Sequence, residues 1–153
     1  MGTIKLEAGS ITTVADTELN SLAAGSGVLG KEYDNGNSSN LFPEAFFELN
    51  VDFVSAPAAG GYVDLYLIPA PDGTNYDDST AGASEYAPDT CFVGRFPVQA
   101  TANAQKIPLG LNMFGGVRLP ACKVKPFLIN STNQAFPASG STLKMLPNRY
   151  QSA

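Results

Sequence analysis

The segment from residue 44 to residue 54, EAFFELNVDFV, alternates apolar and polar side chains with a period of two. The apolar members that would share one face of an extended chain are Phe47, Leu49, Val51 and Phe53. The polar members that would share the other face are Glu48, Asn50 and Asp52. Because a helix would scatter these side chains around its axis, the alternation predicts an antiparallel strand with one buried and one wet face.

The same period recurs after a turn-like linker, SAPAAGG, at 55–61. In YVDLYLI, one face would carry Val63, Leu65 and Leu67, and the other Tyr62, Asp64 and Tyr66. These two segments are predicted to be consecutive antiparallel strands.

Four further segments have strand character. In residues 90–98 we expect Phe92, Phe96 and Val98 on one face, with a bulge at Gly94. Residues 105–109 form a short strand that Pro108 places at a sheet edge, and residues 122–130 form a strand with a kink or an edge at Pro126. Residues 141–147 form the last strand.

Strands spaced by turn signals, with almost no helical pattern, predict the all-β class. We expect residues 1–153 to form a single-domain antiparallel β-sandwich. The long connections at 70–89 and 110–121 favour a jelly-roll-like or Greek-key topology over a meander. One short helix is predicted near residues 16–23, with Asp16 as its cap. The terminal segments 1–14 and 147–153 are predicted to be extended arms.

Charge and composition argue against several kinds of partner. Only 15% of the residues are charged, the net charge is −5, and the nine Lys and Arg residues are scattered, so we expect no nucleic-acid binding. No run of about 18 apolar residues exists, so we expect no membrane span.

The first residues lack the apolar core of a secretory signal, which predicts synthesis in a cytosolic setting where Cys91 and Cys122 stay reduced. A bridge between these two cysteines stays open if neighbouring strands bring them together.

The chain contains no histidine, which removes Ser–His and Cys–His nucleophile pairs. Ser–Lys or paired-carboxylate chemistry stays open in principle. Glu44, Glu48 and Asp52 share a strand face, and we interpret them as its wet side rather than as a catalytic pair. No nucleotide-binding motif and no CxxC spacing occurs. We therefore expect no enzymatic activity, no catalytic residues, no metal and no cofactor.

Residues 62–78, YVDLYLIPAPDGTNYDD, begin as a strand and end in an acidic tip. The oxygen-bearing side chains of the tip are Asp72, Asn75, Asp77 and Asp78. EF-hand spacing is absent, and Asp-Gly is a common turn dipeptide because Asp accepts backbone hydrogen bonds and Gly adopts positive φ. The tip is therefore predicted to turn the chain, with a weak calcium site and a partner-docking loop as the alternatives.

Exposed aromatic side chains on the second strand suggest a contact surface. Tyr62 and Tyr66 would form either a sugar-stacking platform or the apolar centre of a subunit interface, and the low charge of the chain favours the interface. The candidate partner-contact residues are Tyr62, Tyr66, Asp72, Asn75, Tyr76 and Asp77.

Three quoted segments carry a resemblance to a known group: GYVDLYLIPAPDGTNYDD, CFVGRFPV and FLINSTNQAFPASGSTLKMLP. Together they resemble small virion proteins of tailed bacteriophages over roughly residues 61–147. The shared features fix turns and strands rather than a reaction, and the first sixty residues show no such likeness.

This resemblance implies a capsid cement or decoration protein that sits as a homotrimer on the outer surface of the head. Its partner would then be the major capsid protein and its location the virion, after synthesis in the host cytoplasm. Two alternatives come with the resemblance: a carbohydrate- or host-surface-binding module of a head fibre or tail, and a tail or baseplate subunit.

Overall fold

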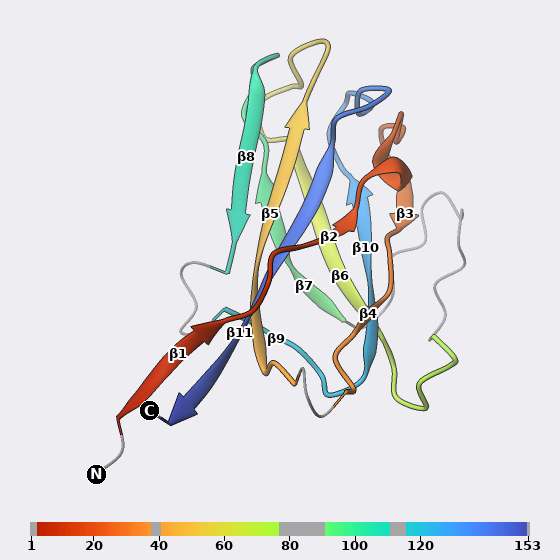
Figure 1. Ribbon diagram of the computed structural model, residues 1–153. Helices are drawn as coiled ribbons and strands as arrows, with labels where there is room; N and C mark the ends of the chain where they lie inside the picture. The colour runs from red at the N-terminus through yellow and green to blue at the C-terminus, as the bar shows by residue number, and fades with distance from the viewer. Residues whose placement is uncertain (1–2, 38–40, 77–90, 111–115, 153) are drawn as a thin grey trace.

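The computed structural model describes residues 3–37, 41–76, 91–110 and 116–152 (Figure 1). Within these ranges the chain forms strands and one short 3-10 helix. In chain order the elements are β1 (Ile4–Ala8), β2 (Thr12–Ala15), η1 (Thr17–Leu19), β3 (Gly27–Leu29), β4 (Tyr33–Asp34), β5 (Glu44–Asp52), β6 (Tyr62–Ala70), β7 (Phe92–Pro97), β8 (Ala104–Leu109), β9 (Val117–Arg118), β10 (Lys123–Asn130) and β11 (Thr142–Ser152).

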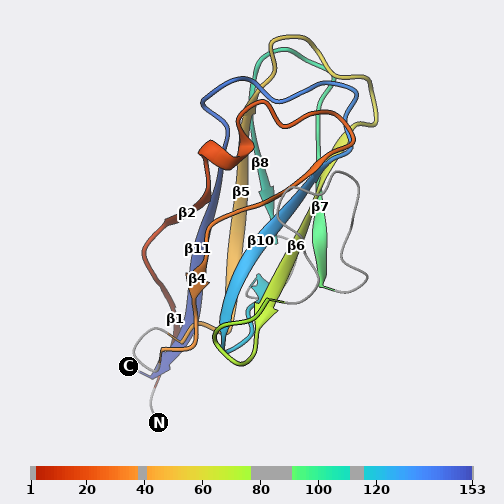
Figure 2. The same ribbon diagram turned by 90° about the vertical axis from the view of Figure 1, so that its right-hand side faces the viewer.

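The strands form two antiparallel sheets that face each other (Figure 2). Sheet A has the order β1-β11-β5-β8, with β2 also paired to β11 and β9 to β5. Sheet B has the order β3-β10-β6-β7, with β4 also paired to β10. The chain changes sheet between β2 and β3, β4 and β5, β5 and β6, β7 and β8, β9 and β10, and β10 and β11, and the two strand orders are those of a jelly roll. The predicted all-β, jelly-roll-like sandwich is confirmed.

The core lies between the sheets and is built from the inward rows of their strands. On β5 the predicted alternation is confirmed, since Phe47, Leu49 and Val51 are each almost fully buried. Inward side chains of β6 and β10 meet them across the gap, and those of β11 pack beside them in the same sheet: Val63, Leu65, Leu67, Leu128, Leu143 and Met145. Removing this much apolar surface from water is the main favourable term in the folding of such a sandwich.

The face predicted for Phe92 is wrong. The β6–β7 register shifts between Leu65 and Tyr66, so that Gly94 lies opposite Leu65 while Phe92 lies opposite Tyr66. Across this shift β7 has one residue more than β6. As a result Phe92 lies on the outer face, where it is 55% exposed, whereas Phe96 stays buried. A bulge was expected in this strand, but its effect on the side-chain row depends on the partner strand.

Pro126 lies in an interior strand, so of the kink or edge expected there, the edge is wrong. One side of β10 pairs with β6, and the other pairs with β3 at residues 127–129 and with β4 at residues 123–124. Pro126 falls between these two short partners, and its carbonyl accepts the N–H of Gly30 at 2.7 Å. Neither β3 nor β4 pairs with residue 126, so no hydrogen bond from its backbone nitrogen is needed there. The missing N–H of proline is therefore tolerated.

The loops at one end of the sandwich are held by Asn130, which is fully buried. Its Nδ2 donates to the carbonyls of Leu22 and Gln134 at 3.1 and 2.8 Å. Its Oδ1 accepts from the backbone N–H and the hydroxyl of Thr132. This side chain therefore ties the segment after η1 to the loop that follows β10. The helix expected near residues 16–23 is present only as the single turn η1, and Asp16 caps it as predicted.

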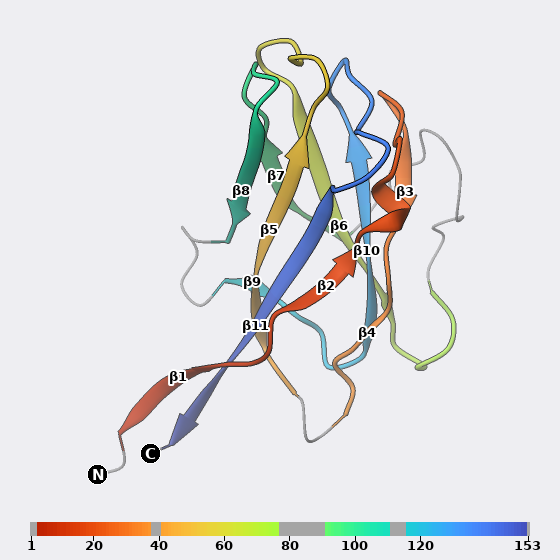
Figure 3. The same cartoon turned by 45° about the horizontal axis from the view of Figure 1, so that its top comes forward.

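Both ends of the described chain run together in a two-stranded ribbon. Figures 1 and 3 show β1 and the last residues of β11 extending side by side beyond the sandwich. The segment that projects is shorter than the predicted arm 1–14, because Val14 and Ala15 of β2 are buried in the core. At the C-terminal end, the predicted arm is the continuation of β11 itself.

We expect Asn130→Ala to lower the free energy of unfolding by about 2–4 kcal/mol, because several buried carbonyl and N–H groups lose their partner together. Urea unfolding of the two proteins measures this change. The matched control is Asn103→Ala in an exposed turn, where about 0.5 kcal/mol or less is expected. Equal stability losses for the two variants would contradict the assigned role of Asn130.

Candidate interaction surface

The predicted contact residue Tyr62 lies on the outer face of sheet B beneath a charged pair. The Arg95 guanidinium stacks over its ring, 3.4 Å from the centroid. Arg95 also donates to both carboxylate oxygens of Asp64, at 2.7 and 3.1 Å. The ion pair covers one face of Tyr62, which leaves that face unavailable for stacking on a sugar.

Tyr66 is the centre of an aromatic cluster on the same face. Its ring packs edge to face against Phe92 at 5.4 Å and against Phe127 at 6.3 Å between centroids. Phe127 is buried and Tyr66 half-buried, so Phe92 is the exposed member of the three. The cluster is consolidated within the chain, in geometry that aromatic pairs prefer.

The tip after β6 is a turn whose polar groups bond to one another. Asp72 Oδ1 accepts the N–H groups of Thr74 and Asn75 at 2.9 and 2.7 Å, and Oδ2 accepts from the Asn75 side chain at 2.7 Å. Gly73 has φ +77°, the positive value predicted for it. These hydrogen bonds to the charged form lower the pKa of Asp72. Asp77 and Asp78 lie outside the described residues.

Tyr76 connects the tip to Glu32, which directly precedes β4, and to β10. Its hydroxyl donates to Glu32 Oε2 at 2.6 Å, and Lys125 Nζ lies 4.3 Å from its ring centroid. Lys123 completes the group with an ion pair to Glu32 at 3.1 Å. Desolvation, and then the hydrogen bond to Glu32, raise the pKa of the Tyr76 phenol.

Metal-ligand clusters and a disulfide were two further possibilities for the described residues. No group of three or more His, Cys, Asp or Glu side chains in these ranges lies close enough together to hold a metal ion. Cys91 and Cys122 form no disulfide with each other. In the described part of the chain, no helix is long and apolar enough to cross a membrane.

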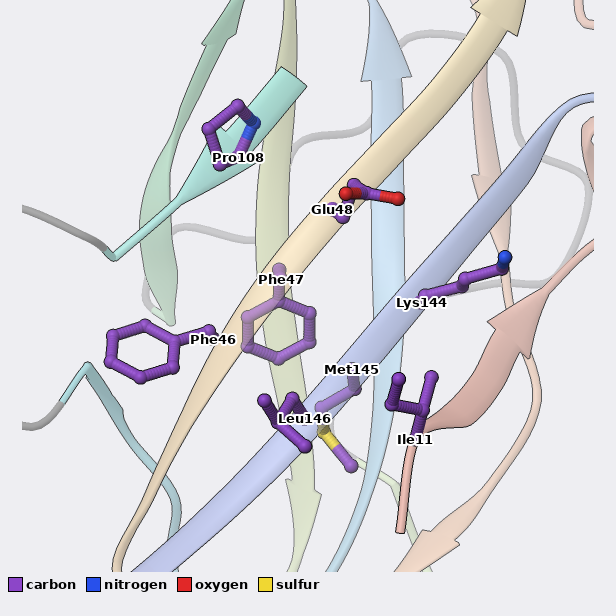
Figure 4. Close-up of a pocket in the computed structure, with 8 residues that line it drawn as sticks. All are labelled: Ile11, Phe46, Phe47, Glu48, Pro108, Lys144, Met145 and Leu146. Carbon is purple, nitrogen blue, oxygen red and sulfur yellow. The ribbon is translucent and has the colours of Figure 1, made fainter. Parts of the chain in front are cut away.

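An apolar groove of about 270 Å³ lies on the outer face of sheet A (Figure 4). Its wall residues come from the loop before β2 and from β5, β8 and β11: Ile11, Phe46, Pro108 and Leu146. Glu48 and Lys144, which lie directly opposite each other in the β5–β11 register, flank it with one charge of each sign. A shallow apolar floor with a polar margin is the general form of a protein–protein contact.

Exposed apolar side chains gather toward the same side of the molecule. Ile11 is 67% exposed at the groove, and Ile4, Leu6 and Tyr150 are exposed on the projecting ribbon. Tyr150 and Leu6 lie directly opposite each other across β1 and β11. The groove and the ribbon together are called the sheet A face below.

The sheet A face was not predicted from the sequence. Its one sequence signal is Phe46, an apolar residue in the otherwise polar outward row of β5, Glu44–Asp52. Leu146 and Ile11 join it only through the pairing of strands about one hundred residues apart in the chain, which no local pattern reveals.

We expect Glu32→Gln to lower the pKa of Tyr76, because the variant removes the negative charge that disfavours the phenolate. In the wild type the raised pKa stabilises the fold below the ordinary tyrosine pKa of about 10, and this contribution disappears as the pH rises through the folded value. Ultraviolet titration of phenolate absorption compares the two proteins. Glu18→Gln is the control, and titration curves that coincide for wild type and Glu32→Gln would refute the coupling.

No protein-family model and no curated protein matches the chain. Among solved structures, a chain of Turnip yellow mosaic virus is similar with a TM-score of 0.40 and 12% sequence identity, over 100% of this chain and 82% of the viral one. A chain of Desmodium yellow mottle tymovirus gives a TM-score of 0.39 and 12% identity, over 100% and 89%. At these scores the assignment of a jelly roll stands on the strand order of this chain alone.

Proposed function

We propose that the protein is a non-enzymatic structural component of a virion, and that it binds the outer surface of a phage head as a cement or decoration protein. The observation that supports this most directly is the sheet A face, where an apolar groove and several exposed apolar side chains lie on one side of a weakly charged chain. The sequence resemblance to small virion proteins of tailed bacteriophages supplies the biological setting.

The physical logic of a cement protein fits this surface. Such a protein adds buried area only in the assembled shell, so its binding shifts the equilibrium toward assembly by mass action. A low surface charge limits the desolvation cost of a broad contact, since few ionised groups must leave water. The net charge of −5 opposes contact with packaged DNA, which favours the outer side of the shell.

The partner in this proposal is the major capsid protein, contacted through the groove. The residues predicted earlier on β6 and its tip are a weaker choice, because Tyr62, Tyr66, Asp72 and Tyr76 are already engaged within the chain. Asn75 is also bonded to Asp72. The homotrimer implied by the resemblance stays a prediction.

The carbohydrate-binding alternative is less well supported by the geometry. A sugar-stacking platform needs flat, open aromatic faces, whereas Arg95 covers Tyr62 and two phenylalanines pack on Tyr66. Phe92 alone offers an exposed ring in that cluster. A tail or baseplate location would use the same sheet A face, and binding assays on separated heads and tails distinguish it.

We expect Ile11→Asp to weaken binding to heads stripped of this protein by about tenfold or more, because a carboxylate would be buried in an apolar contact. Cosedimentation of purified protein with stripped heads measures the affinity. Val54→Asp is the matched control, since Val54 is 85% exposed and is not part of the groove lining.

Equal affinities of Ile11→Asp and Val54→Asp for heads would exclude the groove as the contact. Absence of wild-type binding to heads, with binding to purified tails, would replace the cement role by the tail alternative. Both variants change exposed side chains, so thermal unfolding is expected to show intact folds.

A further inference from the structure

The outer edge of β1 is an open strand edge. One side of β1 pairs with β11 in a regular register from Ile4–Ser152 to Ala8–Asn148, and no described strand pairs with its other side. A two-stranded ribbon is marginally stable by itself in water, and this one carries exposed Ile4 and Leu6. A third strand would complete it.

The hydrogen-bonding groups of that edge can be assigned from the ladder. Gly9 donates its N–H to the carbonyl of Pro147 at 2.7 Å, one step beyond the Ala8–Asn148 pair. Hydrogen-bonded and non-hydrogen-bonded pairs alternate in an antiparallel ladder, so Glu7 and Lys5 direct their backbone groups toward β11. The N–H and C=O groups of Ile4, Leu6 and Ala8 therefore face away from the sheet.

The other described sheet edges are protected against pairing. On β2 the register with β11 shifts, and the carbonyl of Val14 accepts the N–H of Lys31. Pro108 interrupts β8, Pro97 ends the irregular β7, and β3, β4 and β9 are only three, two and two residues long. Such bulges, prolines and short strands are the usual means of preventing edge-to-edge association. The edge of β1 has no bulge and no proline, and its two charged residues, Lys5 and Glu7, have opposite signs.

We propose that β1 pairs antiparallel with β1 of a second copy of this chain about a two-fold axis at Leu6. In this register Leu6 lies opposite Leu6, Ile4 opposite Ala8, and Lys5 opposite Glu7 of the second copy. The strand is thus complementary to itself in charge. All the outward backbone groups of Ile4, Leu6 and Ala8 find partners.

Neighbouring side chains extend this complementarity across the contact. Glu7 already pairs with Arg149 at 2.7 Å, so its carboxylate would lie between that guanidinium and Lys5 of the second copy. On the opposite face, Leu6 lies beside Tyr150 in each copy, which gives a continuous apolar row. Opposite charges and apolar pairs directly across strands are the pairs that stabilise antiparallel sheets.

This register is favoured because the two adjacent positions of the two-fold axis place like charges opposite each other. Moving the two-fold axis to Lys5 places Lys5 opposite Lys5, and moving it to Glu7 places Glu7 opposite Glu7. Like charges directly opposite each other destabilise a strand pair. Of these three axes, the one at Leu6 avoids both like-charge pairs and places Lys5 opposite Glu7.

This contact is isologous and closes at two copies, in contrast to the three-fold assembly implied by the sequence resemblance. A two-fold axis perpendicular to the sheet leaves the outer faces of both sheets A on the same side. The two grooves would then belong to one composite surface. The inference rests on the strand edge and stands independently of the proposed virion role.

The test measures solution mass by sedimentation equilibrium over a concentration series that reaches about 1 mM, a range suited to weak pairing. The wild type is expected to approach the mass of two chains. Lys5→Glu is expected to raise the dimer dissociation constant about tenfold or more, because two attractive cross-strand pairs become repulsive. Lys106→Glu on β8 makes the same change of net charge at the other edge of sheet A and is expected to leave the dimer intact.

A mixing experiment keeps the test decisive. The variant E7K/R149E reverses the ion pair within the ribbon, so its own dimer would place Lys5 opposite a second lysine, and it is expected to be monomeric. When it is mixed with the Lys5→Glu variant, both cross-strand pairs at positions 5 and 7 again join a lysine to a glutamate, and a heterodimer is expected. A monomeric wild type, a trimer, or a dimer that Lys5→Glu does not weaken would overturn the proposal, as would failure of the mixture to dimerise.

Discussion

The register between β11 and β5 is the constraint on which most of this structure depends. It places Leu143 and Met145 opposite Leu49 and Phe47 in the core. Because side chains alternate along a strand, the same register places Leu146 opposite Phe46 on the outside. A one-residue slip would exchange the two rows and remove both the core and the groove. The fold and the candidate contact surface therefore have a single structural origin.

The last strand of the chain is also an interior strand of its sheet. Since β11 pairs with β5 on one side and with β2 and β1 on the other, sheet A is complete only when both ends of the chain have joined it. Such non-local pairing is characteristic of jelly rolls and slows folding, because long loops must close before the contacts form. It also places the two termini together, where the ribbon leaves the body (Figure 3).

The sequence predicted those features that depend on local period and turn chemistry. The alternating strand at 44–54, the capping Asp16 and the turn at Asp72–Gly73 all followed from neighbouring residues. The face of Phe92 and the tolerance of Pro126 depended on which strand lies alongside, so local patterns gave the wrong answer. The groove and the Tyr76–Glu32 contact join residues far apart in the chain, and apart from Phe46 no local sequence signal points to them.

The regular pairing edge of β1 is suited to a weak contact between two copies of the chain. A five-residue strand pair buries too little surface for a tight dimer, since stable interfaces bury about 1,200–2,000 Å² in total. Its weakness is compatible with an assembly role, because copies fixed side by side on a shell meet at effective concentrations of about millimolar. In the proposed virion role, a contact that is weak in dilute solution would be occupied on the shell, and the charge pattern of Lys5 and Glu7 favours the register with its axis at Leu6. An unprotected edge is in this way consistent with a protein that stays dispersed until it is assembled.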